Sequence, residues 1–138
     1  MANANSTTIN TPLSADLDLF QVAEACVKFV IELGECDNIA GKLAWCGRLS
    51  HALTQLRGLC DVDLPPHLIE KLTAEELPAS CVPDYWSETY MLVDYAQALA
   101  QTLLSSTQTA EVTGQLTGLL HDLIHLMASY IKEPRFIK

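Results

Sequence analysis

The sequence is poor in charge, and above all in positive charge. Charged residues make up 18% of the 138 residues, and 8 Lys and Arg stand against 17 Asp and Glu, which gives a net charge of −9. A protein that binds a nucleic-acid backbone or an anionic membrane needs clustered positive side chains to neutralise phosphates. We therefore expect no direct contact with nucleic acid or with a membrane, whereas a basic protein partner is compatible with the excess of acid.

Long uninterrupted apolar runs are also missing. A membrane-spanning helix needs about 20 consecutive apolar residues, and the closest candidate segment is interrupted by Glu24, Lys28 and Glu32. The start of the chain, MANANSTTINTPL, lacks the apolar stretch that directs secretion. These two absences predict a cytoplasmic protein.

The cysteines lack the spacing that is typical of redox-active or metal-binding sites. Five are present, an odd number, and no two form a CxxC pair. Cys26 and Cys46 stand among apolar positions of helical periodicity, where an unpaired cysteine packs as a small hydrophobic residue. We expect a reducing compartment, no structural disulfide and no catalytic thiol.

Signals for β-structure are absent as well. Apolar and polar residues do not alternate over any sustained stretch, and no Asn-Gly or Asp-Gly turn occurs. Apolar residues recur instead at spacings of three and four, which predicts helices over residues 14–33, 37–59, 84–105 and 109–132. The chain is therefore predicted to be all-α, folded as an antiparallel four-helix bundle.

Local signals suggest where these helices are interrupted. Gly34 is predicted to end the first helix in a left-handed conformation. The segment 61–83 holds four of the six prolines, which predicts a short helical, proline-rich crossover between the second and third long helices. Residues 1–13 are expected to be a flexible N-terminal tail, and residues 14–138 a single bundle domain.

The apolar faces exceed what one small bundle comfortably hides. Apolar residues make up 49% of the chain, and the first helix has such a narrow polar stripe that it must be covered on several sides. Gly114 and Gly118, four residues apart on the last helix, are predicted to form a notch against the alanine-rich side of helix 84–105. The apolar helix surface that remains uncovered predicts a homodimer through the first or the last helix.

The pentapeptide HDLIH at 121–125 is a candidate metal site. His121 and His125, at i and i+4, lie on one helix face and could share a metal ion. The spacing is that of HExxH, with Asp122 in the place of the glutamate of metal hydrolases. A third ligand would have to be brought in by the fold, from His51, His67 or Glu133. Metal binding or hydrolysis by His121, Asp122 and His125 is an alternative to the plainer interpretation of half-exposed surface histidines.

The stretch Arg48–Gly58 carries a second candidate, His51. A histidine midway along the second helix of a bundle is similar to the phosphorylated histidine of phosphotransfer domains and of histidine-kinase dimerisation helices. The following residues depart from both patterns. Ala52 stands where the kinase-type box has an acid, and Thr54 and Gln55 stand where the phosphotransfer-type box has Lys and then Gly. A phosphotransfer-like bundle is a second alternative, and it requires that His51 face solvent.

Aromatic residues gather around the start of the third long helix. Tyr85, Trp86 and Tyr90, with Trp45 on the second helix, are the candidate interaction residues, because Trp and Tyr are frequent anchors of protein interfaces. They also seal the ends of helical bundles. No phosphate-binding glycine loop and no nucleophile elbow occurs. We therefore expect a small, non-enzymatic regulatory or adaptor protein that binds a protein partner and uses no cofactor.

Overall fold

The computed structural model describes residues 11–138, and residues 1–10 lie outside the described part. Five α-helices are present in that part: α2 (Leu19–Glu35), α3 (Ile39–Cys60), α4 (Pro66–Lys71), α5 (Thr89–Ser105) and α6 (Ala110–Ile131). The other elements are a 3₁₀ helix and two short strands: η1 (Asp84–Trp86), β1 (Thr73–Ala74) and β2 (Phe136–Ile137). The predicted all-α class is confirmed. No described helix is both long enough and apolar enough to cross a bilayer.

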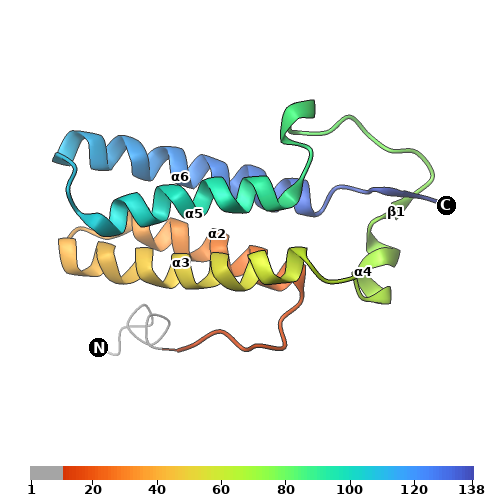
Figure 1. Cartoon of the computed structure of the whole chain (residues 1–138), viewed down its shortest axis with the longest axis horizontal. Coiled ribbons are helices and arrows are strands. Elements are labelled where there is room, and N and C mark those ends of the chain that lie inside the picture. The colour runs from red at the N-terminus through yellow and green to blue at the C-terminus, as the bar shows by residue number, and fades with distance from the viewer. Residues whose placement is uncertain (1–10) are drawn as a thin grey trace.

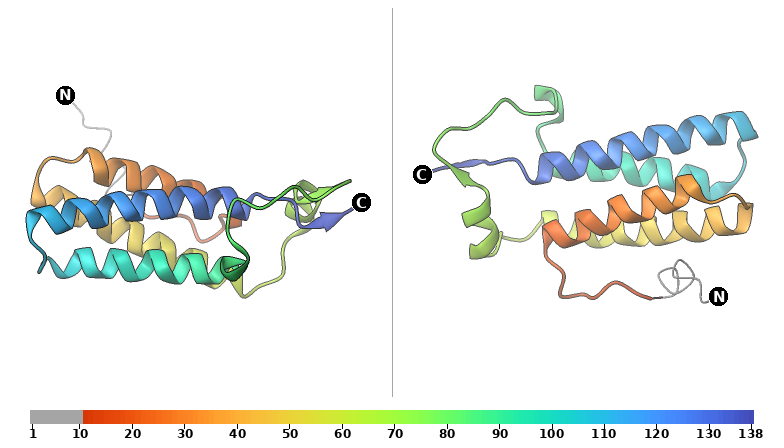
Figure 2. Two further views of the ribbon diagram at one scale, coloured as in Figure 1. Left: turned by 90° about the horizontal axis from the view of Figure 1, so that it is seen from above. Right: turned by 180° about the vertical axis from the view of Figure 1, so that it is seen from behind.

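The four long helices lie side by side (Figure 1). Helix α2 packs against α3 and α6, and α5 packs against the same two helices. Short connections, residues 36–38 and 106–109, join α2 to α3 and α5 to α6 at one end of the molecule, here called the loop end. The long connection from α3 to α5 lies at the opposite, crossover end, together with the C-terminus (Figure 2).

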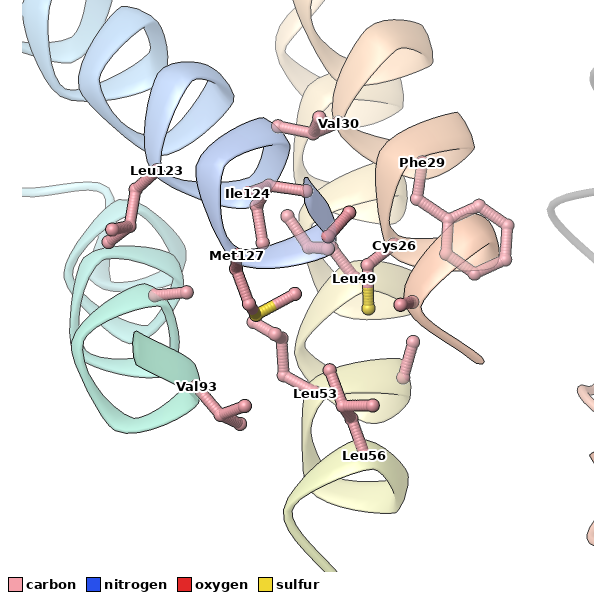
Figure 3. Packing of buried hydrophobic residues seen from close by; sticks show 14 of the residues in the cluster. Cys26, Phe29, Val30, Leu49, Leu53, Leu56, Val93, Leu123, Ile124 and Met127 are labelled. Atoms are coloured by element: carbon pink, nitrogen blue, oxygen red, sulfur yellow. The ribbon is translucent and has the colours of Figure 1, made fainter. Parts of the chain in front are cut away.

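The core between the long helices is almost entirely apolar. Leu49 and Leu53 of α3 and Ile124 and Met127 of α6 point into the same space (Figure 3), and each is 0% exposed. Burial of each such side chain contributes about 1.5–3 kcal/mol to folding. Ser50 is the one buried polar residue among those described.

Ser50 takes part in a hydrogen-bond network between α3 and α5. Its Oγ donates to Gln97 Oε1 at 2.8 Å, and Gln97 Nε2 donates to the Ser50 carbonyl at 3.0 Å and to Thr54 Oγ1 at 3.0 Å. Gln101 Nε2 donates to Ser50 Oγ at 2.9 Å. Because these bonds require one alignment of the two helices, the network specifies the register of α5 on α3.

Helix α2 begins and ends at residues other than those predicted. It begins at Leu19 because Asp18 and Gln21 cap each other: each side chain accepts the other residue's backbone N–H at 2.9 Å. The helix then continues through Gly34 to Glu35. The predicted left-handed stop at Gly34 is wrong, since no described glycine has a positive φ.

The residues before α2 run along the outside of the helices. The Arg48 guanidinium donates to the carbonyl of Thr11, and Gln55 Nε2 donates to the carbonyl of Ser14 at 2.8 Å. The described end of the predicted flexible tail, residues 11–13, is therefore attached to α3. The rest of that tail lies outside the described residues.

The crossover is joined to the C-terminal tail by a parallel strand pair. Thr73 pairs with Phe136, and Ala74 pairs with Ile137. The Lys138 N–H donates to the Ala74 carbonyl at 3.0 Å. The sequence predicted no strand, because a strand of two residues is too short to leave an alternating pattern.

The glycines of α6 do not form the predicted notch. Gly114 and Gly118 are both exposed, and a Cβ atom added at either position would meet no heavy atom within 4 Å. Close packing against α5 therefore does not offset the helix-propensity cost of about 1 kcal/mol per glycine.

Replacing Gly114 or Gly118 with Ala is expected to raise the free energy of unfolding by about 0.4–1 kcal/mol each, because the methyl group enters open space and restricts the unfolded chain. Denaturant unfolding measures the change. Gly41→Ala is the matched control and should lose stability. Its Cβ would collide with Cys36 Sγ and meet Asn38 Oδ1 at 3.0 Å, the oxygen that caps α3. Equal effects at Gly41 and Gly118 would contradict this account.

The Asp18 carboxyl group makes the free energy of unfolding depend on pH in the acidic range. Its Oδ2 lies 3.0 Å from His67 Nε2. Partial burial opposes ionisation, but hydrogen bonds from His67 and from the Gln21 backbone amide lower the pKa of Asp18 from 3.8. The folded state thus favours the carboxylate, and the resulting stabilisation is present above about pH 4 and lost as pH falls through the lowered pKa.

Asp18→Asn keeps a capping oxygen but removes the charge, so this variant should be less stable than the wild type near neutral pH. The difference should narrow below about pH 4, where the wild-type carboxylate becomes protonated. Denaturant unfolding at a series of pH values measures it. A difference that stays constant down to about pH 2 would show that the carboxylate charge does not matter.

Candidate functional site

Four aromatic residues of η1 and the first two turns of α5, at the crossover end, are here called the aromatic surface: Tyr85, Trp86, Tyr90 and Tyr95. Tyr85 is 74% exposed, and Tyr90 and Tyr95 are 42% and 43% exposed. The ring centroid of Trp86 lies 6.0 Å from that of Tyr85 and 6.0 Å from that of Tyr95, both in edge-to-face geometry. Trp86 therefore joins Tyr85 and Tyr95 into one cluster of contacting rings, which presents a defined apolar surface.

The chain direction around η1 brings these rings together. The Trp86 N–H donates to the Pro83 carbonyl at 2.9 Å, which closes the 3₁₀ turn. Glu88 is extended, so α5 begins only at Thr89, and Trp86 reaches Tyr95 in the second turn of that helix. Tyr95 was not among the predicted interaction residues, because its contact with Trp86 depends on the break between η1 and α5, which helical spacing does not show.

Tyr90 connects the aromatic surface to α3. The Arg57 guanidinium lies over its ring, 5.0 Å from the centroid. Arg57 is held there by Asp61 at 2.9 Å and by Asp94 at 3.1 Å. Because two carboxylates flank Arg57, they neutralise its charge locally, and the surroundings of Tyr90 are acidic overall.

Trp45 does not belong to the aromatic surface. Its side chain is only 2% exposed, and its ring centroid lies 5.9 Å from that of Phe29 in α2. The predicted interaction role of Trp45 is therefore corrected: it packs in the core between α2 and α3.

The histidines of α6 are close together, as their spacing predicted. The ring centroids of His121 and His125 are 4.2 Å apart, with the rings tilted by 38°. His125 Nδ1 lies 2.9 Å from the His121 carbonyl oxygen, and His121 Nδ1 lies 3.2 Å from Asp122 Oδ1. A backbone carbonyl and a carboxylate accept hydrogen bonds, so each Nδ1 atom is assigned as the donor.

The fold does not bring a third metal ligand to this pair. Glu133 accepts a hydrogen bond from the Cys81 backbone N–H at 2.7 Å, and His67 is paired with Asp18. No group of three or more His, Cys, Asp or Glu residues in the described part of the chain could hold a metal ion. The arrangement therefore lacks the three protein ligands of a hydrolytic zinc centre.

His51 lies on the exposed side of α3. A phosphotransfer role would require this exposure of His51 to solvent. The departures at Ala52, Thr54 and Gln55 remain, and the His51 side chain forms no hydrogen bond or ion pair with the described residues.

A cavity of about 510 Å³ opens at the loop end, between the two short connections. Residues from all four long helices line it, among them Leu33, Lys42, Cys46, Leu103 and Thr113. Its volume suits a small ligand. Lys42 is the one charged residue in the lining, so no acid–base pair is available for catalysis. No local motif indicated this cavity, because its lining is far apart in sequence.

All five cysteines are unpaired, and three of them are poorly reactive by position. Burial raises the pKa of Cys26 to about 12 and that of Cys46 to about 11. Desolvation and the neighbouring Glu133 carboxylate raise the pKa of Cys81 to about 11. Thiolates are the reactive form, so none of these three thiols is suited to nucleophilic catalysis near neutral pH.

No protein-family model matches the chain, and no curated protein and no solved structure is significantly similar to it.

Proposed function

We propose that the chain is a non-enzymatic protein-interaction module. Its four long helices form an antiparallel bundle, and the aromatic surface binds a basic segment of another protein. The single observation that carries the proposal is the exposed edge-to-face cluster of Tyr85, Trp86 and Tyr95.

The antiparallel bundle is supported by the connections and by the packing. Helices joined by a few residues must reverse direction, which applies to α2 with α3 and to α5 with α6. Each long helix packs against two of the others around one apolar core. Such a scaffold holds surface residues at constant positions, which suits recognition.

The aromatic surface has the composition of an interface anchor. Trp, Tyr and Arg dominate binding energy at protein interfaces, and this surface combines Trp86 and three tyrosines with Arg57 over Tyr90. Tyr85 leaves 74% of its surface in water although it already contacts Trp86. A partner that covers these rings would bury apolar area at little cost in side-chain entropy.

The charge around the aromatic surface favours a basic partner. Asp84 and Glu88 flank the rings, and neither forms an ion pair within the described chain. Arginine and lysine side chains also stack on aromatic faces. The net charge of −9 would attract such a segment over a longer range.

A homodimer through α2 or α6 remains part of the proposal. Helix α6 leaves more apolar surface uncovered, since Leu119 is 55% exposed and Val112 is 40% exposed. On α2, Ile31 is 37% exposed, and most other apolar residues are buried or half-buried. Sedimentation velocity over a range of concentrations tests the dimer separately from the basic partner.

Binding of basic peptides tests the aromatic surface. The chain has two tryptophans, so Trp45→Phe leaves Trp86 as the sole fluorescent indole, at the proposed site. We expect peptides rich in Arg and apolar residues to change Trp86 emission saturably. By calorimetry, Trp86→Ala should weaken binding by about 2 kcal/mol or more, which is about thirtyfold.

Ile39→Ala is the matched control, because Ile39 is 73% exposed but lies at the loop end. This variant should bind as the wild type does. Acidic peptides of equal apolar content should not bind, and added salt should weaken the binding of basic ones. Equal binding of acidic and basic peptides, or an equal loss in Ile39→Ala, would contradict the proposed site.

A further inference from the structure

The two histidines of α6 are arranged with their Nε2 atoms available. In each ring Nδ1 donates a hydrogen bond, from His125 to the His121 carbonyl and from His121 to the Asp122 carboxylate. A neutral imidazole whose Nδ1 carries the proton has its lone pair on Nε2. Within the described chain, neither Nε2 has a hydrogen-bond partner.

These hydrogen bonds are of the kind found around metal-binding histidines. A ligating histidine almost always donates its other ring N–H to a carboxylate or to a backbone carbonyl, which orients the ring and makes the ligating nitrogen more basic. His121 has the carboxylate type of partner, and His125 has the carbonyl type.

The rings are also close and accessible. Their centroids are 4.2 Å apart, and the His121 side chain is 44% exposed. Gly114 and Gly118 lie on the same stripe of α6 as the two histidines, at positions i, i+4, i+7 and i+11. Because open space surrounds both glycines, no side chain there blocks the approach of an ion with its remaining ligands.

We propose that His121 and His125 form a bidentate site for one divalent transition-metal ion. Imidazole nitrogen suits Cu²⁺, Ni²⁺ and Zn²⁺, whereas Mg²⁺ and Ca²⁺ prefer oxygen. Water, or the same pair from a second copy of the chain, completes the coordination, since the described residues provide no third ligand. Asp122 is a positioning residue that orients His121. The site shares no residue with the aromatic surface, so either can fail without the other.

Calorimetric titration of tag-free protein with CuCl₂, NiCl₂, ZnCl₂ and MgCl₂ tests the site. We expect saturable binding of the first three, tightest for Cu²⁺, and none for Mg²⁺. One ion per chain indicates completion by water, and one ion per two chains indicates a bridged pair; both support the site. Binding should also raise the thermal midpoint, because the ion binds the folded chain.

Three variants locate the ion. His121→Ala and His125→Ala should each abolish bidentate binding, and both should fold, because Ala favours the helix at these surface positions. Asp122→Ala should weaken binding by about tenfold, since it removes only the orienting partner. His51→Ala, on the exposed side of α3, is the matched control and should leave binding unchanged.

Nitrogen NMR of the histidine rings gives a readout that does not depend on affinity. Zn²⁺ should shift the Nε2 resonances of His121 and His125 and leave their Nδ1 atoms protonated. The His51 and His67 rings should not respond. Unchanged Nε2 resonances, metal binding that survives in the His121→Ala/His125→Ala double variant, or equal binding of Mg²⁺ would overturn the proposal.

Discussion

The rest of the structure depends on the burial of α2 between α3 and α6. This helix has apolar residues around most of its circumference, and seven of them are buried: Leu19, Val22, Ala23, Cys26, Phe29, Val30 and Leu33. One neighbour cannot cover them, so α3 packs on one side, where Phe29 contacts Trp45, and α6 packs on another, where Lys132 pairs with Glu24. Helix α5 packs on both α3 and α6 and so completes the group of four long helices.

Features of the fold could be predicted where the controlling interactions are local. Helix α6 was predicted over 109–132 and spans Ala110–Ile131, because the Thr109 cap and the apolar spacing lie within the segment itself. The helix end predicted at Gly34 was wrong because glycine permits a left-handed conformation but does not require one. The reciprocal cap of Asp18 and Gln21 was missed, since the first helix was predicted to begin at residue 14, although the two residues have the three-residue spacing of a capping box. The β1–β2 pair was missed as well, because its strands are some sixty residues apart in sequence.

The candidate sites, too, could be predicted where local spacing determines them and not where tertiary packing does. The proximity of His121 and His125 follows from helical spacing alone, and their ring centroids are 4.2 Å apart. Trp45 and Trp86 could not be distinguished, because exposure depends on which helix face the neighbours cover: Trp45 faces Phe29, and Trp86 lies at the surface beside Tyr85. The positions of possible third ligands likewise depend on tertiary packing, which a single sequence does not reveal.

The C-terminal end of α6 determines how rigidly the aromatic surface is held. The Tyr130 hydroxyl donates to the carbonyl of Ser87, immediately after η1, and Glu133 accepts from the Cys81 backbone N–H at 2.7 Å. These bonds attach the long crossover to α6 and to the residues just after it, close to Trp86. A crossover of this length would otherwise have to be ordered when the proposed partner binds, at a cost in affinity. Because these bonds already hold the crossover in the folded chain, the exposed rings form a preorganised surface that is supported by α6 as well as by α5.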